Sequence, residues 1–382
     1  MAAAPAAVQH IVRDTFHAVA TDVALGGSAA RARSADKSWQ HWCGFCVRYN
    51  IDELLTAYDD PVPALQLYIR QYRDGSGSPS KRAVRARTVE QALRTVGQTL
   101  AGMGRPDPRF TSAGKIDFRL QRQLAAYART DPPPSRVKPV PLPVLQHAAT
   151  LHYSAHHPHS HALADMLILA FFFLLRPGEY ALATSAEDSH AFRILDVHCF
   201  IGNRHLDILA CPEGDLWATT RVGLEFTTQK NAVRGEIIGH ARSGSPIWCP
   251  VLAIVRRIVS LRHAGAPPTQ PIYSYNYRNV WYAISPSHLT QVLRQSVAAV
   301  GHLYGIHPDD VSVRSLRSSG AMALLCGNID SDRIRLLGRW RSDEMLRYLH
   351  VQAFPARDHL ATTMLHHGAF SLIPNPQRVP PP

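Results

Sequence analysis

The segment LLGRWRSDEMLRYLH, residues 336–350, combines one tyrosine with several arginines. Tyr348 follows Arg339, Trp340 and Arg341 within a single short stretch. A guanidinium group presents paired donors that match phosphate oxygens, and it stays charged at physiological pH. A phenol hydroxyl can attack phosphorus and form a covalent intermediate. The segment therefore indicates either phosphate chemistry at Tyr348 or an amphipathic surface helix whose tyrosine closes the core.

Three earlier segments carry side chains that suit the same chemistry. LLRPGEY places Arg176 after a long apolar run, with Glu179 one turn further on. TTQKN places Lys230 at a predicted turn between two strands, and SVRSLRSSGAM places Arg314 three residues before Arg317, hence on one helical face. Each residue taken singly has a structural explanation, such as a helix cap or a surface ion pair. Their common order favours one shared site.

This order resembles the tyrosine recombinases, also called the phage integrase superfamily. Their pattern is an arginine in a G-L-R-x-x-E box, a lysine in a β-hairpin, H-x-x-R, then a histidine or tryptophan, and a nucleophilic tyrosine nine positions later. Arg176, Lys230, Arg317 and Tyr348 match four of these positions, and Arg339 stands at the fifth. The G-R-W wording followed by S-D most resembles recombinases of eukaryotic mobile elements, the Crypton and DIRS types.

The resemblance implies a fold and a reaction. The fold would be mainly α with a small antiparallel β-sheet: a helical, SAM-like core-binding domain and a catalytic domain that clamp duplex DNA. Arginines would hold the phosphate oxygens while Tyr348 attacks, giving a 3′-phosphotyrosine and a free 5′-hydroxyl. Lys230 would donate the proton that the leaving hydroxyl needs. The reaction needs no metal and no nucleotide cofactor, because the covalent link conserves the bond for rejoining.

Two positions depart from the family pattern. Arg314 replaces the histidine of H-x-x-R, and Arg339 occupies the histidine or tryptophan position, with Trp340 displaced by one. Guanidinium does not deprotonate in proteins, so both arginines are expected to act as added phosphate donors. Trp340 is expected to pack behind Tyr348 or to offer its indole N–H. The predicted catalytic set comprises Arg176, Lys230, Arg314, Arg317, Arg339 and Tyr348, supported by Glu179 and Trp340.

The elements around these residues are predicted to form two domains. The predicted divisions are a flexible arm at 1–33, a helical core-binding domain at 34–130, a proline-rich linker at 131–143, a catalytic domain at 144–355 and a tail at 356–382. Helices are predicted near 34–49, 62–72, 86–103, 116–129, 144–176, 250–263 and 287–300, and then again up to about residue 350. Strands are predicted over 192–201, 205–210, 216–229 and 235–240.

Composition points to a polyanionic partner. The formal net charge is +12 and 46% of the residues are hydrophobic, as in a globular protein. The loop at 75–87 is a predicted DNA-backbone contact or nuclear address, and its alternative is a solvated loop. Its basic residues are Lys81, Arg82, Arg85 and Arg87. The apolar run at 166–175 is too short to cross a bilayer and predicts a buried helix.

Two motifs that suggest other chemistry have simpler explanations. Cys43 and Cys46 form a C-x-x-C pair, but the surrounding tryptophans recur at helical spacing, which favours packing over redox chemistry. The histidines of 152–161 match no structural zinc spacing. Six cysteines without regular spacing indicate free thiols in a reducing compartment. The N-terminal residues show no secretion signal.

The sequence leaves three functions open. The first is a site-specific recombinase or integrase that assembles as a tetramer on two DNA sites, from a monomer or dimer in solution. The second is a non-catalytic DNA-binding protein derived from such an enzyme, and the third is a type IB topoisomerase-like enzyme. The expected partner is duplex DNA, with no membrane. The expected location is the nucleus in a eukaryote and otherwise the cytoplasm or nucleoid.

Overall fold

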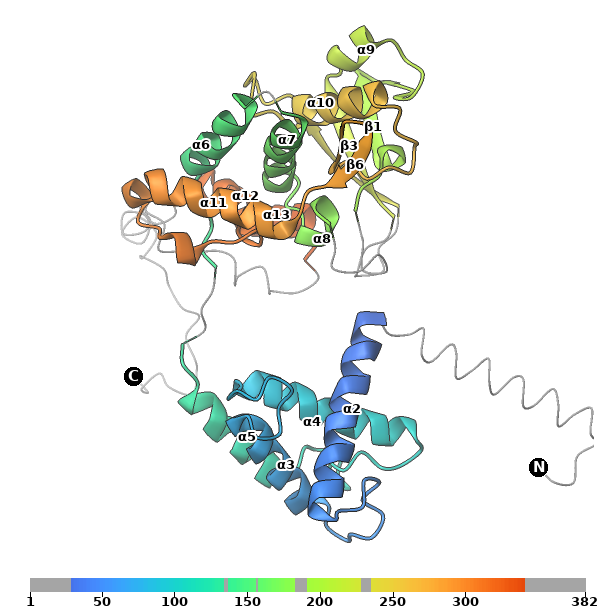
Figure 1. The fold of residues 1–382 in the computed structure, drawn as a ribbon, viewed down its shortest axis with the longest axis vertical. Helices are drawn as coiled ribbons and strands as arrows, with labels where there is room; N and C mark the ends of the chain where they lie inside the picture. Colours follow the sequence, from blue (N-terminus) through green and yellow to red (C-terminus); the bar gives the residue numbers. More distant parts are fainter. Residues whose placement is uncertain (1–28, 134–136, 156, 183–190, 228–234, 341–382) are drawn as a thin grey trace, which may run out of the picture. The chain divides into compact units, whose positions relative to one another are not determined.

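The chain folds into two compact units, residues 1–135 and 136–382 (Figure 1). The structure is a computed structural model that describes residues 29–133, 137–155, 157–182, 191–227 and 235–340. The first unit is helical and the second is helical with small antiparallel sheets, as the sequence predicts. None of the described helices is long and apolar enough to span a membrane.

The first unit packs four helices around an aromatic core. They are α2 (Ala29–Tyr49), α3 (Val62–Asp74), α4 (Ala86–Gly102) and α5 (Phe118–Thr130). Trp42 is fully buried, and its indole N–H donates to the carbonyl of Glu53 at 2.9 Å. Cys46 lies in the same core, and burial raises the pKa of its thiol to about 12. Cys43 packs against the same core, and burial disfavours the reactive thiolate, so these contacts support packing as the role of the C-x-x-C pair.

The helix boundaries differ from prediction where caps decide them. The first helix begins at Ala29, inside the predicted arm. The last begins at Phe118, because the carboxylate of Asp117 accepts the backbone N–H of Arg119 at 2.8 Å and caps the helix there. Gly75, with φ +95°, ends α3 in the left-handed conformation that favours glycine.

The two ends of the predicted proline-rich linker, 131–143, make contacts with the two units. At its start, Asp131 accepts the backbone N–H of Ala86 at 2.9 Å, which holds it to the first unit. At its end, Lys138 forms an ion pair with Asp310 at 2.8 Å, and Val140 is buried in the second unit. The described residues on both sides therefore belong to the two units.

The second unit is built around α7 (Pro158–Phe172), the predicted buried helix. Its residues from Ala162 to Ala170 are fully buried or nearly so. It packs against α6, α10 and α12 (Figure 1). The other helices are α6 (Leu142–Tyr153), α8 (Pro177–Tyr180), α9 (Glu213–Trp217), α10 (Pro250–His263), α11 (Pro286–Val300), α12 (Ser315–Cys326) and α13 (Ser331–Gly338). Short 3-10 turns cover Ile194–Asp196, Gly301–Tyr304 and Pro308–Asp310.

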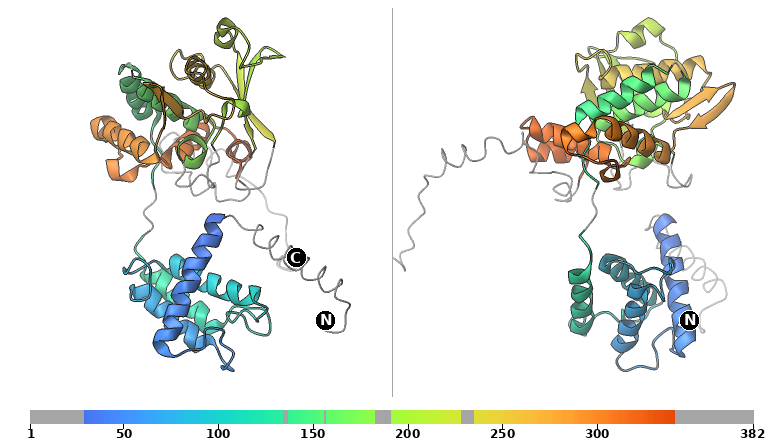
Figure 2. Two further views of the ribbon diagram at one scale, coloured as in Figure 1. Left: turned by 45° about the vertical axis from the view of Figure 1, so that its right-hand side comes forward. Right: turned by 60° about the vertical axis from the view of Figure 1, so that its left-hand side comes forward.

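A four-stranded antiparallel sheet lies beside α10 (Figure 2). Its order is β2 (Arg204–His205), β1 (Val197–Ile201), β3 (Arg221–Phe226) and β4 (Glu236–Ala241). Leu224 of β3 lies opposite Val197 on one side and Ile238 on the other. Strands β3 and β4 border residues 228–234, which include Lys230.

Three strand predictions need correction. The strand predicted at 192–201 starts only at Val197, because Ile194–Asp196 form a 3-10 turn in which the Asp196 carboxylate accepts the backbone N–H of Arg193 at 2.8 Å. Residues 206–210 form a turn, because the carboxylate of Asp207 accepts the backbone N–H groups of Leu209 and Ala210. The predicted strand 216–229 also starts too early, since its first residues complete α9. A hairpin of β5 (Ser274–Tyr277) and β6 (Val280–Ala283) was not predicted. Its turn places Arg278 and Asn279 at positive φ, which suits the twist of a two-residue hairpin.

Candidate active site

The carbonyl end of α7 gathers the arginine motifs of the second unit. Arg317 on α12 donates from Nη1 to the carbonyl of Leu174 at 2.8 Å, two residues before Arg176. Leu174 turns the chain with φ +49°, which carries it out of α7. Arg317 is buried and also donates to the carbonyl of Gly338, at the end of α13. It therefore joins α7, α12 and α13 at one point.

Close helix packing makes this geometry accessible. A Cβ at Gly320 would overlap the carbonyl oxygen of Phe171 and the side chain of Leu174, so only glycine lets α12 approach α7 this closely. The guanidinium of Arg317 lies over the ring of Trp340, 4.3 Å from its centroid. This cation–π contact fixes the direction of the guanidinium.

Glu179 organises the next turn of chain. Its carboxylate accepts the backbone N–H of Arg176 at 2.7 Å and Nη1 of the same residue at 3.1 Å. The Glu179 side chain is 3% exposed, whereas the Arg176 side chain is 27% exposed and reaches solvent. Tyr180 donates its hydroxyl to the carbonyl of Val313 at 2.7 Å, so α8 is tied to the segment that precedes α12.

Arg339 lies inside the protein rather than on its surface. It follows α13 in the left-handed conformation, with φ +56°, and its side chain is 3% exposed. Nη2 donates to Oε2 of Glu179 at 3.0 Å, and the guanidinium lies 3.8 Å from the ring centroid of Phe226. Burial lowers the pKa of Arg339 to about 10, so it remains charged at neutral pH. It forms a buried ion pair with Glu179.

The predicted site residues fall into three groups. The contacts described above bring together the first group, which comprises Arg176, Glu179, Arg317, Arg339 and Trp340.

Arg314 precedes α12 and is exposed, whereas Arg317, one turn inside the helix, is buried. These two arginines therefore occupy different environments, although their spacing predicts a shared face. Lys230 and Tyr348 lie outside the described residues.

Two residues in this region escaped the sequence reasoning. Phe226 supplies the ring beneath Arg339. His240 of β4 contacts the carbonyl oxygen of Phe172 through Nε2 at 2.9 Å, and burial lowers the pKa of its imidazole. Both residues lie on strands along which apolar and polar side chains alternate. This alternation predicts the buried face of each strand, but it does not predict the helix end that Phe226 and His240 approach.

The predicted DNA-contact loop of the first unit is solvent-exposed at its basic positions. Lys81, Arg82, Arg85 and Arg87 all have exposed side chains. The loop is nevertheless held by an internal hydrogen bond, because Ser78 is buried and its hydroxyl donates to the carbonyl of Arg82 at 3.0 Å. The guanidinium of Arg85 donates to the carbonyl of Pro133 at 3.2 Å.

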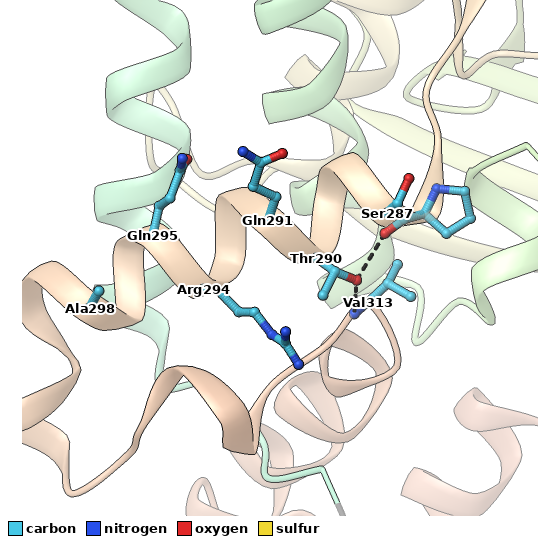
Figure 3. Close-up of a pocket in the computed structure, with 8 residues that line it drawn as sticks. Ser287, Thr290, Gln291, Arg294, Gln295, Ala298 and Val313 are labelled. Carbon is cyan, nitrogen blue, oxygen red and sulfur yellow. Dashed lines mark hydrogen bonds between the residues drawn. The ribbon is translucent and has the colours of Figure 1, made fainter.

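An open groove of about 630 Å³ runs along α11 in the second unit (Figure 3). Ser287, Thr290, Gln291, Arg294 and Gln295 line it. Arg294 donates from Nε to the carbonyl of Val311 at 3.3 Å. Helix α11 has no acidic side chain, so the groove suits an anionic or hydrogen-bonding partner.

No metal centre is found in the part of the chain that the structure describes, where no group of three or more His, Cys, Asp or Glu is placed to hold an ion. The described histidines of the 152–161 segment pack instead. His159 stacks on His288 with ring centroids 4.5 Å apart, and it meets the ring of Tyr275 edge-on.

Comparisons with known proteins give weak structural neighbours only. No protein-family model and no curated protein matches the sequence. A solved structure of the Tn1549 transposon integrase with circular intermediate DNA is similar at TM-score 0.44 and 14% identity, covering 78% of this chain and 84% of that one. The crystal structure of XerA recombinase gives TM-score 0.36 and 10% identity, covering 88% of this chain and 100% of that one.

Proposed function

We propose that the chain cuts and rejoins DNA strands through a covalent phosphotyrosine intermediate, as a site-specific recombinase or integrase. The observation that carries the proposal is the meeting of two arginine motifs from distant parts of the sequence. Arg317 binds the carbonyl of Leu174, immediately before the turn that carries Arg176. The motif order of the sequence supplies Lys230 and Tyr348, the two further groups that the reaction needs.

The reaction follows from the chemistry of these groups. The Tyr348 oxygen attacks the phosphorus of a phosphodiester, a Tyr–O–P bond forms, and the bond to the 5′ oxygen breaks. Lys230 gives its proton to that oxygen, and the phenol proton leaves to water. Cationic arginines stabilise the charge that builds on the non-bridging oxygens, which is commonly the largest catalytic contribution. The reverse reaction, with a 5′-hydroxyl from another strand, rejoins the DNA.

Arg176 and Arg314 are the arginines of this set with solvent-facing side chains among the described residues. We assign them to the phosphate, with Arg317 behind them. The groove along α11 and the basic loop with Lys81 and Arg82 are the surfaces assigned to duplex DNA. Recombination of two sites would then use four copies of the chain, in the nucleus if the host is eukaryotic.

The test is covalent trapping with the full chain. A duplex that the protein binds is first selected from a random-sequence pool. The same duplex is then synthesised with a nick close to the scissile phosphate. After cleavage, the short fragment beside the nick diffuses away, and the covalent adduct accumulates. Wild-type protein is expected to form an adduct that survives denaturing detergent, whereas Tyr348→Phe binds equally and forms none. Equal adduct from both proteins would remove Tyr348 as the nucleophile.

A second candidate function is DNA binding without catalysis. The burial of Arg317 and Arg339 favours it, because these guanidinium groups face carbonyls and Glu179. Specific binding without any adduct, in wild type and in an Arg314→His variant, would establish this alternative. A type IB topoisomerase-like enzyme would instead relax supercoiled plasmid without requiring paired sites.

A further inference from the structure

Arg339 contacts three segments whose relative positions matter for the proposed reaction. Its Nη2 binds Glu179, the carboxylate that also orients Arg176. Its guanidinium reaches the carbonyls of Phe173 and Leu174 at 3.4 Å each, and the second of these also accepts from Arg317.

The third contact links Arg339 to the hairpin of the predicted lysine. Phe226 is the last residue of β3, and the chain then enters the segment that contains Lys230. The Arg339 guanidinium lies over the ring of Phe226, 3.8 Å from its centroid. Arg339 therefore packs directly on the residue that ends β3.

The backbone conformation of Arg339 is a further constraint. Arg339 is the C-cap of α13 in the left-handed conformation, and Tyr348 follows nine residues later in the sequence. A residue without an αL preference occupies this conformation at a cost, which its buried contacts must offset.

The charges argue against phosphate binding by Arg339 in this state. Arg339 and Glu179 are each 3% exposed, and Glu179 serves two guanidinium groups at once. A phosphate that reached Arg339 would have to enter this buried packing and compete with Glu179, and a buried carboxylate that loses its partner is strongly disfavoured. Arg176, at 27% exposure, keeps an open side towards solvent.

We propose that Arg339 is a positioning residue that acts through Glu179 and Phe226, and is not a phosphate ligand. This inference rests on the proposed function, and it replaces the expectation that Arg339 donates to the phosphate. The planar guanidinium is needed because it pairs with a carboxylate at its edge while its face lies on an aromatic ring. A lysine at this position would keep the charge but would lose this fit.

The experiment compares trapping on two versions of the selected site, one with an ordinary scissile phosphodiester and one with a neutral methylphosphonate. Arg176→Gln removes a cation assigned to the phosphate, so its trapping should recover on the neutral substrate. Arg339→Gln should lose about 100-fold in trapping rate on both substrates, because displacing a reacting group by about 1 Å costs on that order. Arg339→Lys should recover part of that loss. Wild-type trapping, measured in parallel, tests the proposed function separately.

Coupling to Glu179 gives the second criterion. Adding Arg339→Gln to Glu179→Gln should cause little further loss, because both changes break the same contact. Phe226→Leu keeps an apolar side chain there but removes the ring, so it should reproduce the loss even if Arg339→Gln fails to fold. Circular dichroism at the assay temperature identifies the folded variants. Recovery of Arg339→Gln on methylphosphonate DNA, or full trapping by Phe226→Leu, would overturn the inference.

Discussion

At the residue scale, the arginines of the predicted site differ in burial and in the groups that they contact. Arg176 and Arg314 reach solvent, while Arg317 and Arg339 are buried and bind carbonyl oxygens at the end of α7. Residue type predicts a guanidinium at each position, but burial decides whether its donors face a ligand or the protein. Glu179 compensates the buried charge, as a buried ion requires.

Gly320 gives a residue-scale prediction about the packing that places Arg317. Gly320→Ala should lower the free energy of unfolding by about 1–3 kcal/mol, because its Cβ would overlap the backbone of Phe171. Gly327→Ala is the matched control at the end of the same helix, where the nearest atom to an added Cβ lies 3.4 Å away. Urea unfolding followed by circular dichroism measures both. Equal stability of the two variants would contradict the close approach.

At the element scale, α7 connects two different environments. Its C-terminal end meets α8 and α12 at the candidate site, and its N-terminal turn packs on the β5–β6 hairpin and α11. The second contact is made by stacked aromatic and imidazole rings, with His159 at its centre. Because α7 is buried and closely packed, a displacement of one end of the helix alters the packing of the other end.

His159 makes the stability of this contact depend on pH. Burial, together with the nearby His288, His152 and His157, lowers the pKa of His159 to about 4 from the ordinary 6.5. The folded protein therefore binds fewer protons than the unfolded chain between these values. The contribution of neutral His159 to the free energy of unfolding should be fully present above pH 6.5 and should be lost as the pH drops towards 4.

Urea midpoints measured from pH 7 to 4.5 provide the check. His159→Gln should flatten this decline, whatever its effect on stability at pH 7. His302→Gln removes an exposed histidine from the turn after α11 and should leave the slope unchanged. Parallel curves for His159→Gln and wild type would contradict the assignment.

At the scale of the whole molecule, the formal net charge of +12 is distributed over two separately folded units. Phosphate contacts by lysine and arginine release condensed counterions, so DNA affinity should fall steeply with salt. The first unit offers Lys81 on an exposed loop beside the start of α4, and Arg105 beyond the opposite end of that helix. These two positions allow a matched comparison.

Lys81→Ala should reduce the slope of log affinity against log salt by about 1 if Lys81 contacts a phosphate. Arg105→Ala removes the same charge from the same unit and should leave the slope unchanged. Both values come from fluorescence anisotropy of labelled duplex DNA over a range of salt concentrations. Equal slopes for the two variants would show that charge matters only in total and that the loop is no DNA contact.

The sequence by itself determined much of the element layout. The continuous apolar run at 166–175 indicated the buried helix α7, and helical periodicity indicated the helices of the first unit. Proline density at 131–143 predicts a domain boundary there, and the two compact units are residues 1–135 and 136–382. Local capping then moved individual helix ends, and an Asp207 turn removed a predicted strand.

The tertiary structure decided how the candidate site is assembled. The motif spacing placed Arg176, Arg317 and Arg339 in one set, but it could not show that Arg339 points inward to Glu179. It also could not reveal Phe226 beneath that guanidinium. Contacts between residues far apart in sequence leave no local periodicity, because they arise only when α7, α13 and β3 pack together. Type and order of the residues are therefore written in the sequence, whereas burial and partners are properties of the packed fold.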